Sequence, residues 1–123
     1  MQDFRKLRVW QRAQDLCVRV YQFSADFPME ERYGMTTQLR RAGVSVGANL
    51  AEGSKRKSPT DKARIFNIAE SEAAEAMSLL DLAERLRFGQ DAEARRLCGQ
   101  YDELLAMIES LCQQIFRESQ RRP

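Results

Sequence analysis

The chain has 123 residues, 43% hydrophobic and 31% charged, with a net charge of +2, which is the balance of one ordinary globular domain. It contains no histidine, which excludes histidine-dependent catalytic triads and imidazole metal sites, and no apolar run approaches the ~20 residues that span a bilayer. Because the charged residues 1–6 are atypical of a signal peptide, we expect a single cytoplasmic domain at residues 1–123, without membrane, metal, cofactor or small-molecule substrate.

Helical periodicity extends through nearly the whole chain. The first predicted helix spans residues 4–26, and Phe27-Pro28 ends it because the residue before a proline is disfavoured in helices. A second helix spans residues 35–53, with Thr36 or Thr37 as its cap and Gly53 just past its C-terminal end.

The second half of the chain predicts two further helices. Ser58-Pro59-Thr60-Asp61 has a cap residue, a proline and an acid in the order typical of a helix start, and Gly89 ends this third helix at residue 88. A fourth helix spans residues 91–118. Four helices joined by short loops predict an all-α fold, an antiparallel up-down-up-down four-helix bundle.

The third helix carries two apolar stripes. The first contains Phe66, Ala69, Ala73, Ala76, Met77 and Leu80, as a bundle core requires. The second stripe contains Ile65, Ile68, Leu79, Leu82 and Leu86. This second stripe is explained equally well by wider contact with the neighbouring helices and by an oligomer interface.

The second helix combines small residues with a polar row. Ser45, Asn49 and Glu52 share one face at i, i+4 and i+7, and Arg40 and Arg41 precede them. We interpret these five residues as a structural polar network that fixes the register of helices or subunits. Catalysis is disfavoured, because the set lacks a nucleophile, an activated base and a cluster of metal ligands.

Positive charge is concentrated in the first half of the chain. Residues 1–64 carry 13 Lys and Arg against 7 Asp and Glu, whereas residues 65–123 carry 7 against 11. Two cationic segments are candidate nucleic-acid-binding sites: a helical stripe and a loop followed by Lys62 and Arg64. Their residues are Arg5, Arg8, Arg12 and Arg19 in the stripe and Lys55, Arg56 and Lys57 in the loop. Each segment taken alone is also typical of a solvated surface.

The three cysteines, Cys17, Cys98 and Cys112, are odd in number and scattered among apolar helical positions. This pattern favours reduced core residues over disulfides or metal ligands. The aromatic residues Trp10, Tyr21 and Tyr33 could stack on bases, although helical spacing of aromatics is more typical of a core.

Several of these residues together resemble the bacterial 23S rRNA intervening-sequence proteins. The segment Phe4-Arg5-Lys6-Leu7-Arg8-Val9-Trp10-Gln11-Arg12-Ala13 is similar to the family's opening F-x-x-L-x-V-W-Q-x-A. The similarity continues through Tyr33-Gly34, Gln38–Ala42, Ala48-Asn49 and Ala51-Glu52-Gly53. It extends to Phe66, Ile68-Ala69, Ser71 and Glu75. Gly47 departs from the pattern, since the family usually has proline there.

The resemblance implies a four-helix bundle that assembles into a ring, a homopentamer, in a family whose molecular role is poorly defined. Our leading hypothesis is a non-enzymatic oligomer that contacts RNA or DNA phosphates through its basic residues. A structural protein–protein adaptor without nucleic-acid binding is the alternative. A small hydrolase or nuclease is disfavoured by the absence of histidine and of a carboxylate motif.

Overall fold

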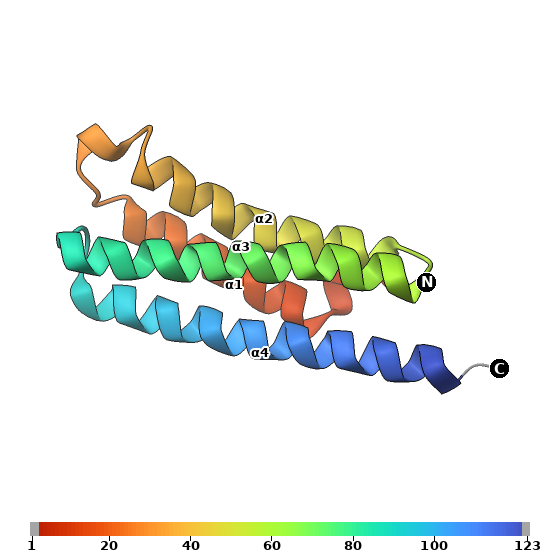
Figure 1. The fold of residues 1–123 in the computed structure, drawn as a ribbon. Coiled ribbons are helices and arrows are strands. Elements are labelled where there is room, and N and C mark those ends of the chain that lie inside the picture. Colours follow the sequence, from red (N-terminus) through yellow and green to blue (C-terminus); the bar gives the residue numbers. More distant parts are fainter. Residues whose placement is uncertain (1–2, 122–123) are drawn as a thin grey trace.

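The computed structural model describes residues 3–121, which fold into four α-helices. They are α1 (Arg8–Ser24), α2 (Met35–Lys55), α3 (Pro59–Leu86) and α4 (Asp91–Arg121). Two short 3-10 helices, η1 (Phe4–Lys6) and η2 (Met29–Glu31), precede α1 and α2. The α-helices lie side by side with their connections at alternating ends (Figure 1), and the part of the chain described contains no strand.

Adjacent helices are antiparallel, because the residue numbers of their contacts rise in one helix as they fall in the other. The contacts are Arg12–Glu103 and Arg19–Glu93 for α1 with α4, Gly47–Trp10 and Arg40–Ser24 for α1 with α2, Gly53–Phe66 and Arg41–Glu75 for α2 with α3, and Met77–Cys98 and Glu84–Arg95 for α3 with α4. The predicted up-down-up-down four-helix bundle follows directly from these contacts.

The core combines large side chains from α1, α2 and α4 with mostly small ones on α3. The buried face of α3 includes four alanines with no exposed surface, Ala69, Ala73, Ala76 and Ala83. Fully buried large residues from the other helices include Leu16, Leu39, Tyr101 and Leu104. The first predicted stripe of α3 therefore faces the core, with Met77 half-buried at its edge. Small residues on one helix let the neighbouring backbones approach closely, and the large ones fill the remaining space.

The start of the first helix differs from the prediction of a single helix over residues 4–26. Leu7 is extended, with φ −75° and ψ 125°, so it separates η1 from α1. Asp3 stabilises this break, because its Oδ1 accepts a hydrogen bond from the Arg5 backbone N–H at 3.0 Å. The extended backbone also places the Leu7 side chain in the core, where it is buried.

The second helix continues past the predicted end at residue 53. Gly53 lies inside α2, where an added Cβ would come within 2.7 Å of the Phe66 ring, so glycine serves close helix packing rather than helix termination. The helix is capped by Gly34 and not by a threonine side chain. The Glu31 carboxylate accepts a hydrogen bond from the Met35 backbone N–H at 3.2 Å. With Gly47 in place of proline, α2 is continuous from residue 35 to 55.

The third helix starts as predicted, because the Ser58 hydroxyl accepts a hydrogen bond from the Asp61 backbone N–H at 3.0 Å and Pro59 follows the cap. It ends two residues before the prediction. Arg87 takes the left-handed conformation, with φ 61°, and closes the helix. The positive φ of Gly89, 72°, completes the turn into α4, which extends to residue 121 rather than 118.

We expect Gly53→Ala to destabilise the bundle. The added methyl group would strike the fully buried Phe66 ring, and the overpacking, about 1–3 kcal/mol, outweighs the gain in helix propensity of about 1 kcal/mol. Gly99→Ala is the matched control: Gly99 also lies inside a helix, but nothing approaches its Cβ position within 4 Å, so this change raises stability. Urea denaturation measures both. Equal effects of the two substitutions would contradict the packing argument.

Candidate nucleic-acid interface

The two cationic segments predicted from the sequence meet at one end of the bundle. η1 and the α2–α3 connection lie side by side there, with Lys55 Nζ and Arg5 Cζ at 5.8 Å and 5.9 Å from the centre of the Phe4 ring. Figure 1 shows the N-terminal segment, the α2–α3 connection and the end of α4 at this same end. We call this surface the basic end; its residues are Arg5, Lys6, Arg8, Lys55, Arg56, Lys57, Lys62 and Arg64.

Few carboxylates neutralise the basic end. The pairs are Arg5–Asp3 at 3.1 Å, Arg56–Glu52 at 2.6 Å and Arg64–Asp61 at 3.8 Å. Within residues 3–121, Lys6, Arg8, Lys55 and Lys57 form no ion pair, and all four are exposed. Exposed ion pairs contribute little to stability, so even the paired arginines remain available to a polyanion.

The predicted arginine stripe is divided in the structure. Arg5 lies in η1, before the break at Leu7, and so does not share a helix with the others. Arg19 is half-buried against α4, where its guanidinium donates to Gln100 Oε1 at 2.5 Å and to Glu93 Oε1 at 3.2 Å. Arg12 also faces α4, with Glu103 at 3.6 Å. The expectation of one continuous row of free guanidinium groups is therefore wrong.

The five residues predicted as one polar network on α2 do not form a single network, although two of them, Arg40 and Arg41, each join α2 to a neighbouring helix. Arg40 turns towards α1, where it donates to Ser24 Oγ at 2.8 Å and its guanidinium lies over the Tyr21 ring. The remaining members form separate contacts: Arg41 with Glu72 and Glu75 of α3, Asn49 with Ser45, and Glu52 with Arg56. The i, i+4 spacing brought Ser45 and Asn49 together, but Arg40 and Arg41 leave the helix in different directions and meet different neighbours.

Sequence reasoning missed the ion pairs that join different helices. Arg41 pairs with α3, and Arg19 and Arg12 pair with α4. Each partner lies more than thirty residues away in the sequence, and no local pattern indicates which carboxylate an arginine will meet. The excess of acids in the second half of the chain was the one available indication.

The predicted oligomer stripe on α3 is partly used by the chain's own core. Ile65 is only 3% exposed and Leu79 is half-buried against the core, so neither forms part of a free apolar face. Ile68, Leu82 and Leu86 are exposed by 40–48%. The part of the stripe open to a second subunit is therefore these three residues.

The thiols and hydroxyls of the core are poor nucleophiles. Cys17, Cys98 and Cys112 are free and half-buried, and burial raises the pKa of each thiol. The Tyr101 hydroxyl is fully buried, and burial raises its pKa as well. Residues 3–121 contain no group of three or more cysteine, aspartate or glutamate residues that could hold a metal ion. Within the same range, no helix has the length and apolar character to cross a membrane.

These features define an all-α bundle whose candidate functional surface consists of cations rather than of catalytic groups. The chain belongs to the 23S rRNA-intervening sequence protein family, whose sequence model matches residues 5–110. This confirms the resemblance found in the sequence.

One similar solved structure is a protein of unknown function from the S23 ribosomal protein family of Bacteroides thetaiotaomicron. The TM-score is 0.76 at 25% sequence identity, and the similarity covers 85% of this chain and 97% of the other. No curated protein matches the sequence.

The division of the stripe predicts different effects for two arginine substitutions. Arg19→Ala removes a half-buried guanidinium and leaves Glu93 and Gln100 with fewer partners, so we expect a loss of about 1–2 kcal/mol in the free energy of unfolding. Arg8→Ala removes an exposed side chain without an ion pair inside residues 3–121, and should change stability by less than about 0.5 kcal/mol. Urea denaturation distinguishes the two, and similar losses would show that Arg8 is structural too.

Proposed function

We propose that this protein is a non-enzymatic, oligomeric bundle that binds nucleic-acid phosphates through its basic end. The observation that carries the proposal is the convergence of two cationic segments, about fifty residues apart in the sequence, on one end of the fold. Four exposed cations there lack an ion pair in the described chain. A group of uncompensated cations attracts a phosphate backbone strongly, because each contact releases counterions.

RNA is the first ligand to test, because the family description refers to 23S rRNA. The basic end presents lysines and arginines on a loop, on η1 and at helix ends, and the residues that the structure describes there include no exposed row of aromatic side chains that could stack on bases. Binding of this kind depends on charge rather than on base sequence, so we expect structured RNA and duplex DNA to bind with similar salt dependence.

An exposed apolar strip on α3 supports the oligomeric part of the proposal. Ile68, Leu82 and Leu86 leave an exposed apolar strip on α3. An oligomer would repeat the basic end once in each subunit, and phosphate contacts in different subunits would then act together. If the protein binds no nucleic acid, the same strip favours the alternative of a protein–protein adaptor.

We expect affinity for a labelled RNA hairpin to fall steeply between low and moderate salt. The variant Arg8→Gln/Lys57→Gln removes two cations that form no ion pair in the described chain. The slope of the logarithm of the binding constant against the logarithm of the salt concentration should therefore decrease in magnitude by about 0.7–0.9 for each lost phosphate contact. Fluorescence anisotropy at several salt concentrations gives the slope, and a duplex DNA of equal length serves as the second ligand.

The control is Arg32→Gln/Arg87→Gln, which removes the same charge from exposed positions at the other end of the bundle. This variant should keep the slope of the unmodified protein. Equal weakening by both variants would indicate a response to net charge alone. Absence of binding at low salt would leave the adaptor as the better account.

The apolar strip on α3 predicts a change of assembly state. Ile68→Glu/Leu82→Glu places two charges on the strip and should lower the molar mass measured by light scattering towards that of a 14.2 kDa monomer. Val18→Glu/Val44→Glu is the matched control, because these two valines lie on α1 and α2 and are at least as exposed as Ile68 and Leu82. An unmodified chain that is already monomeric, or dissociation by the control alone, would contradict an α3 interface.

A further inference from the structure

The core stripe of α4 extends beyond the helices that cover it. Leu97, Leu104 and Ile108 are fully buried, whereas Leu111 and Ile115 continue the same spacing and are only half-buried. The cause is a difference in helix position: α1 starts at Arg8, and its pairing with α4 runs from Arg19–Glu93 to Arg12–Glu103. The last turns of α4 therefore continue past the start of α1.

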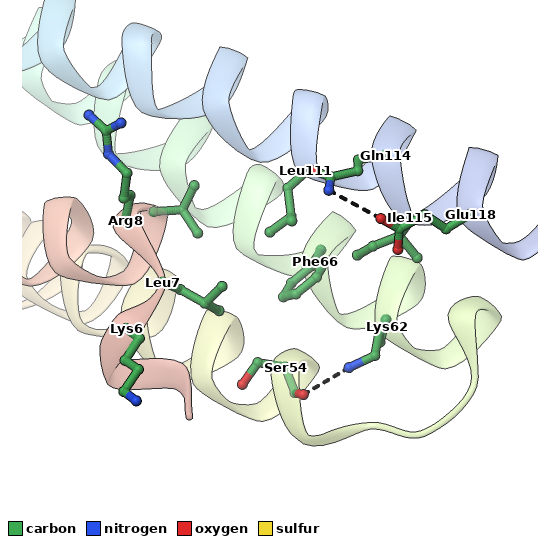
Figure 2. A pocket seen from close by; sticks show the side chains of 11 residues that line it. Lys6, Leu7, Arg8, Ser54, Lys62, Phe66, Leu111, Gln114, Ile115 and Glu118 are labelled. Atoms are coloured by element: carbon green, nitrogen blue, oxygen red, sulfur yellow. Dashed lines mark hydrogen bonds between the residues drawn. The ribbon is translucent and has the colours of Figure 1, made fainter. Parts of the chain in front are cut away.

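A pocket of about 520 Å³ occupies this gap. In Figure 2, the side chains of Leu7, Phe66, Leu111 and Ile115 point towards one another in its middle. The volume lies within the range of small-molecule sites. Four branched aliphatic residues, Leu7, Val9, Leu111 and Ile115, form most of the apolar part of the lining. The Phe66 ring is 2% exposed, so it offers no free aromatic face to stack on a base. An aliphatic chain fits this lining better than a nucleobase does.

The rim of the pocket is cationic. Lys6, Arg8 and Lys62 line it, and Glu118 is the one carboxylate among its lining residues. Glu118 accepts a hydrogen bond from the side-chain amide of Gln114 at 3.2 Å and forms no ion pair with these cations inside residues 3–121. Three cations against one carboxylate favour a negatively charged ligand.

Among the cations of the rim, Lys62 would gain most from an anionic partner. Its ammonium group is half-buried and donates to the Ser54 carbonyl oxygen at 2.8 Å, but it has no ion pair in the part of the chain described. Burial lowers the pKa of this ammonium, which reflects the cost of desolvating an unpaired charge. A carboxylate beside Lys62 would offset that cost and use the donor capacity that Ser54 leaves free.

We propose that this pocket binds an aliphatic carboxylate, of the size of a medium-chain fatty acid, with its chain against Leu111 and Ile115 and its carboxylate beside Lys62. A more open groove across α1 and α4 adjoins the pocket, shares Arg8 and Leu111 with it, and adds Met107 and Arg117. The groove gives the chain of a longer ligand an exit between apolar and cationic side chains. This site does not depend on nucleic-acid binding.

Isothermal titration calorimetry of the full chain with decanoate, below its micelle concentration, tests the proposal. We expect one decanoate for each chain, binding about tenfold more tightly than 1-decanol because the alcohol lacks the charge that pairs with Lys62. Octanoate should bind about tenfold more weakly than decanoate, since two methylene groups fewer are buried. Equal affinities of decanoate and decanol, or no binding of either, would overturn the proposal.

Two variants and two controls locate the site. Ile115→Gln and Lys62→Gln should each weaken decanoate binding about tenfold. Phe116→Gln is the apolar control, because Phe116 is 61% exposed next to Ile115 but lines a different groove, between α3 and α4. Arg64→Gln is the charge control, being an exposed cation close to Lys62 in α3 that does not line the pocket.

Equal loss in Ile115→Gln and Phe116→Gln would show non-specific binding to exposed apolar surface and reject the site. If circular dichroism shows that Ile115→Gln does not fold, Lys62→Gln and the comparison of octanoate with decanoate still test the proposal. A change of molar mass in Ile115→Gln, without any decanoate binding to the unmodified chain, would assign the pocket to a second copy and overturn the proposal.

Discussion

The close approach of α2 to α3 at Gly53 determines the arrangement of the basic end of the molecule. An added Cβ there would lie 2.7 Å from the Phe66 ring, so only glycine permits the two helices to be this close. The contact lies just before the α2–α3 connection and fixes where Lys55, Arg56 and Lys57 emerge from the bundle. A packing constraint in the core therefore sets the position of a charged surface.

The break at Leu7 also helps to position the residues of the basic end. If residues 4–26 formed one straight helix, Arg5 would continue the line of α1 instead of lying beside the α2–α3 connection. The extended Leu7 turns η1 back, and the Phe4 ring packs edge-on against Trp10 with 5.1 Å between ring centres. This short hydrophobic contact holds the N-terminal cations close to Lys55. The basic end depends on it as much as on the charges themselves.

Sequence reasoning recovered what local pattern determines and missed what distant contacts determine. The start of α3 was predictable because Ser58 and Pro59 encode it within one turn. Gly53 was misread as a helix end, because glycine has the same appearance in sequence whether it terminates a helix or admits a neighbouring ring. The convergence of the two cationic segments was equally invisible, since it depends on the bend at Leu7 and on antiparallel packing. The helical spacing of the polar residues on α2 was predicted correctly, but their partners were not. Arg40 contacts Ser24 of α1, whereas Arg41 pairs with Glu75 of α3.

The arginines of α1 divide into two that form ion pairs with α4 and one that remains exposed at the basic end. Arg12 and Arg19 face α4 and meet carboxylates, because α4 runs beside α1 at these positions. Arg8 lies one turn earlier, beside the part of α4 that carries Met107 and Leu111, where it lines the open groove and forms no ion pair with any residue from 3 to 121. The same offset between α1 and α4 leaves Ile115 half-buried, and Lys62, which lines the same pocket, has no ion pair in the part of the chain described. Half-buried apolar side chains and cations without ion pairs in the described residues thus lie together at this end of the bundle. A ligand that carries both an apolar chain and a negative charge would satisfy both at once.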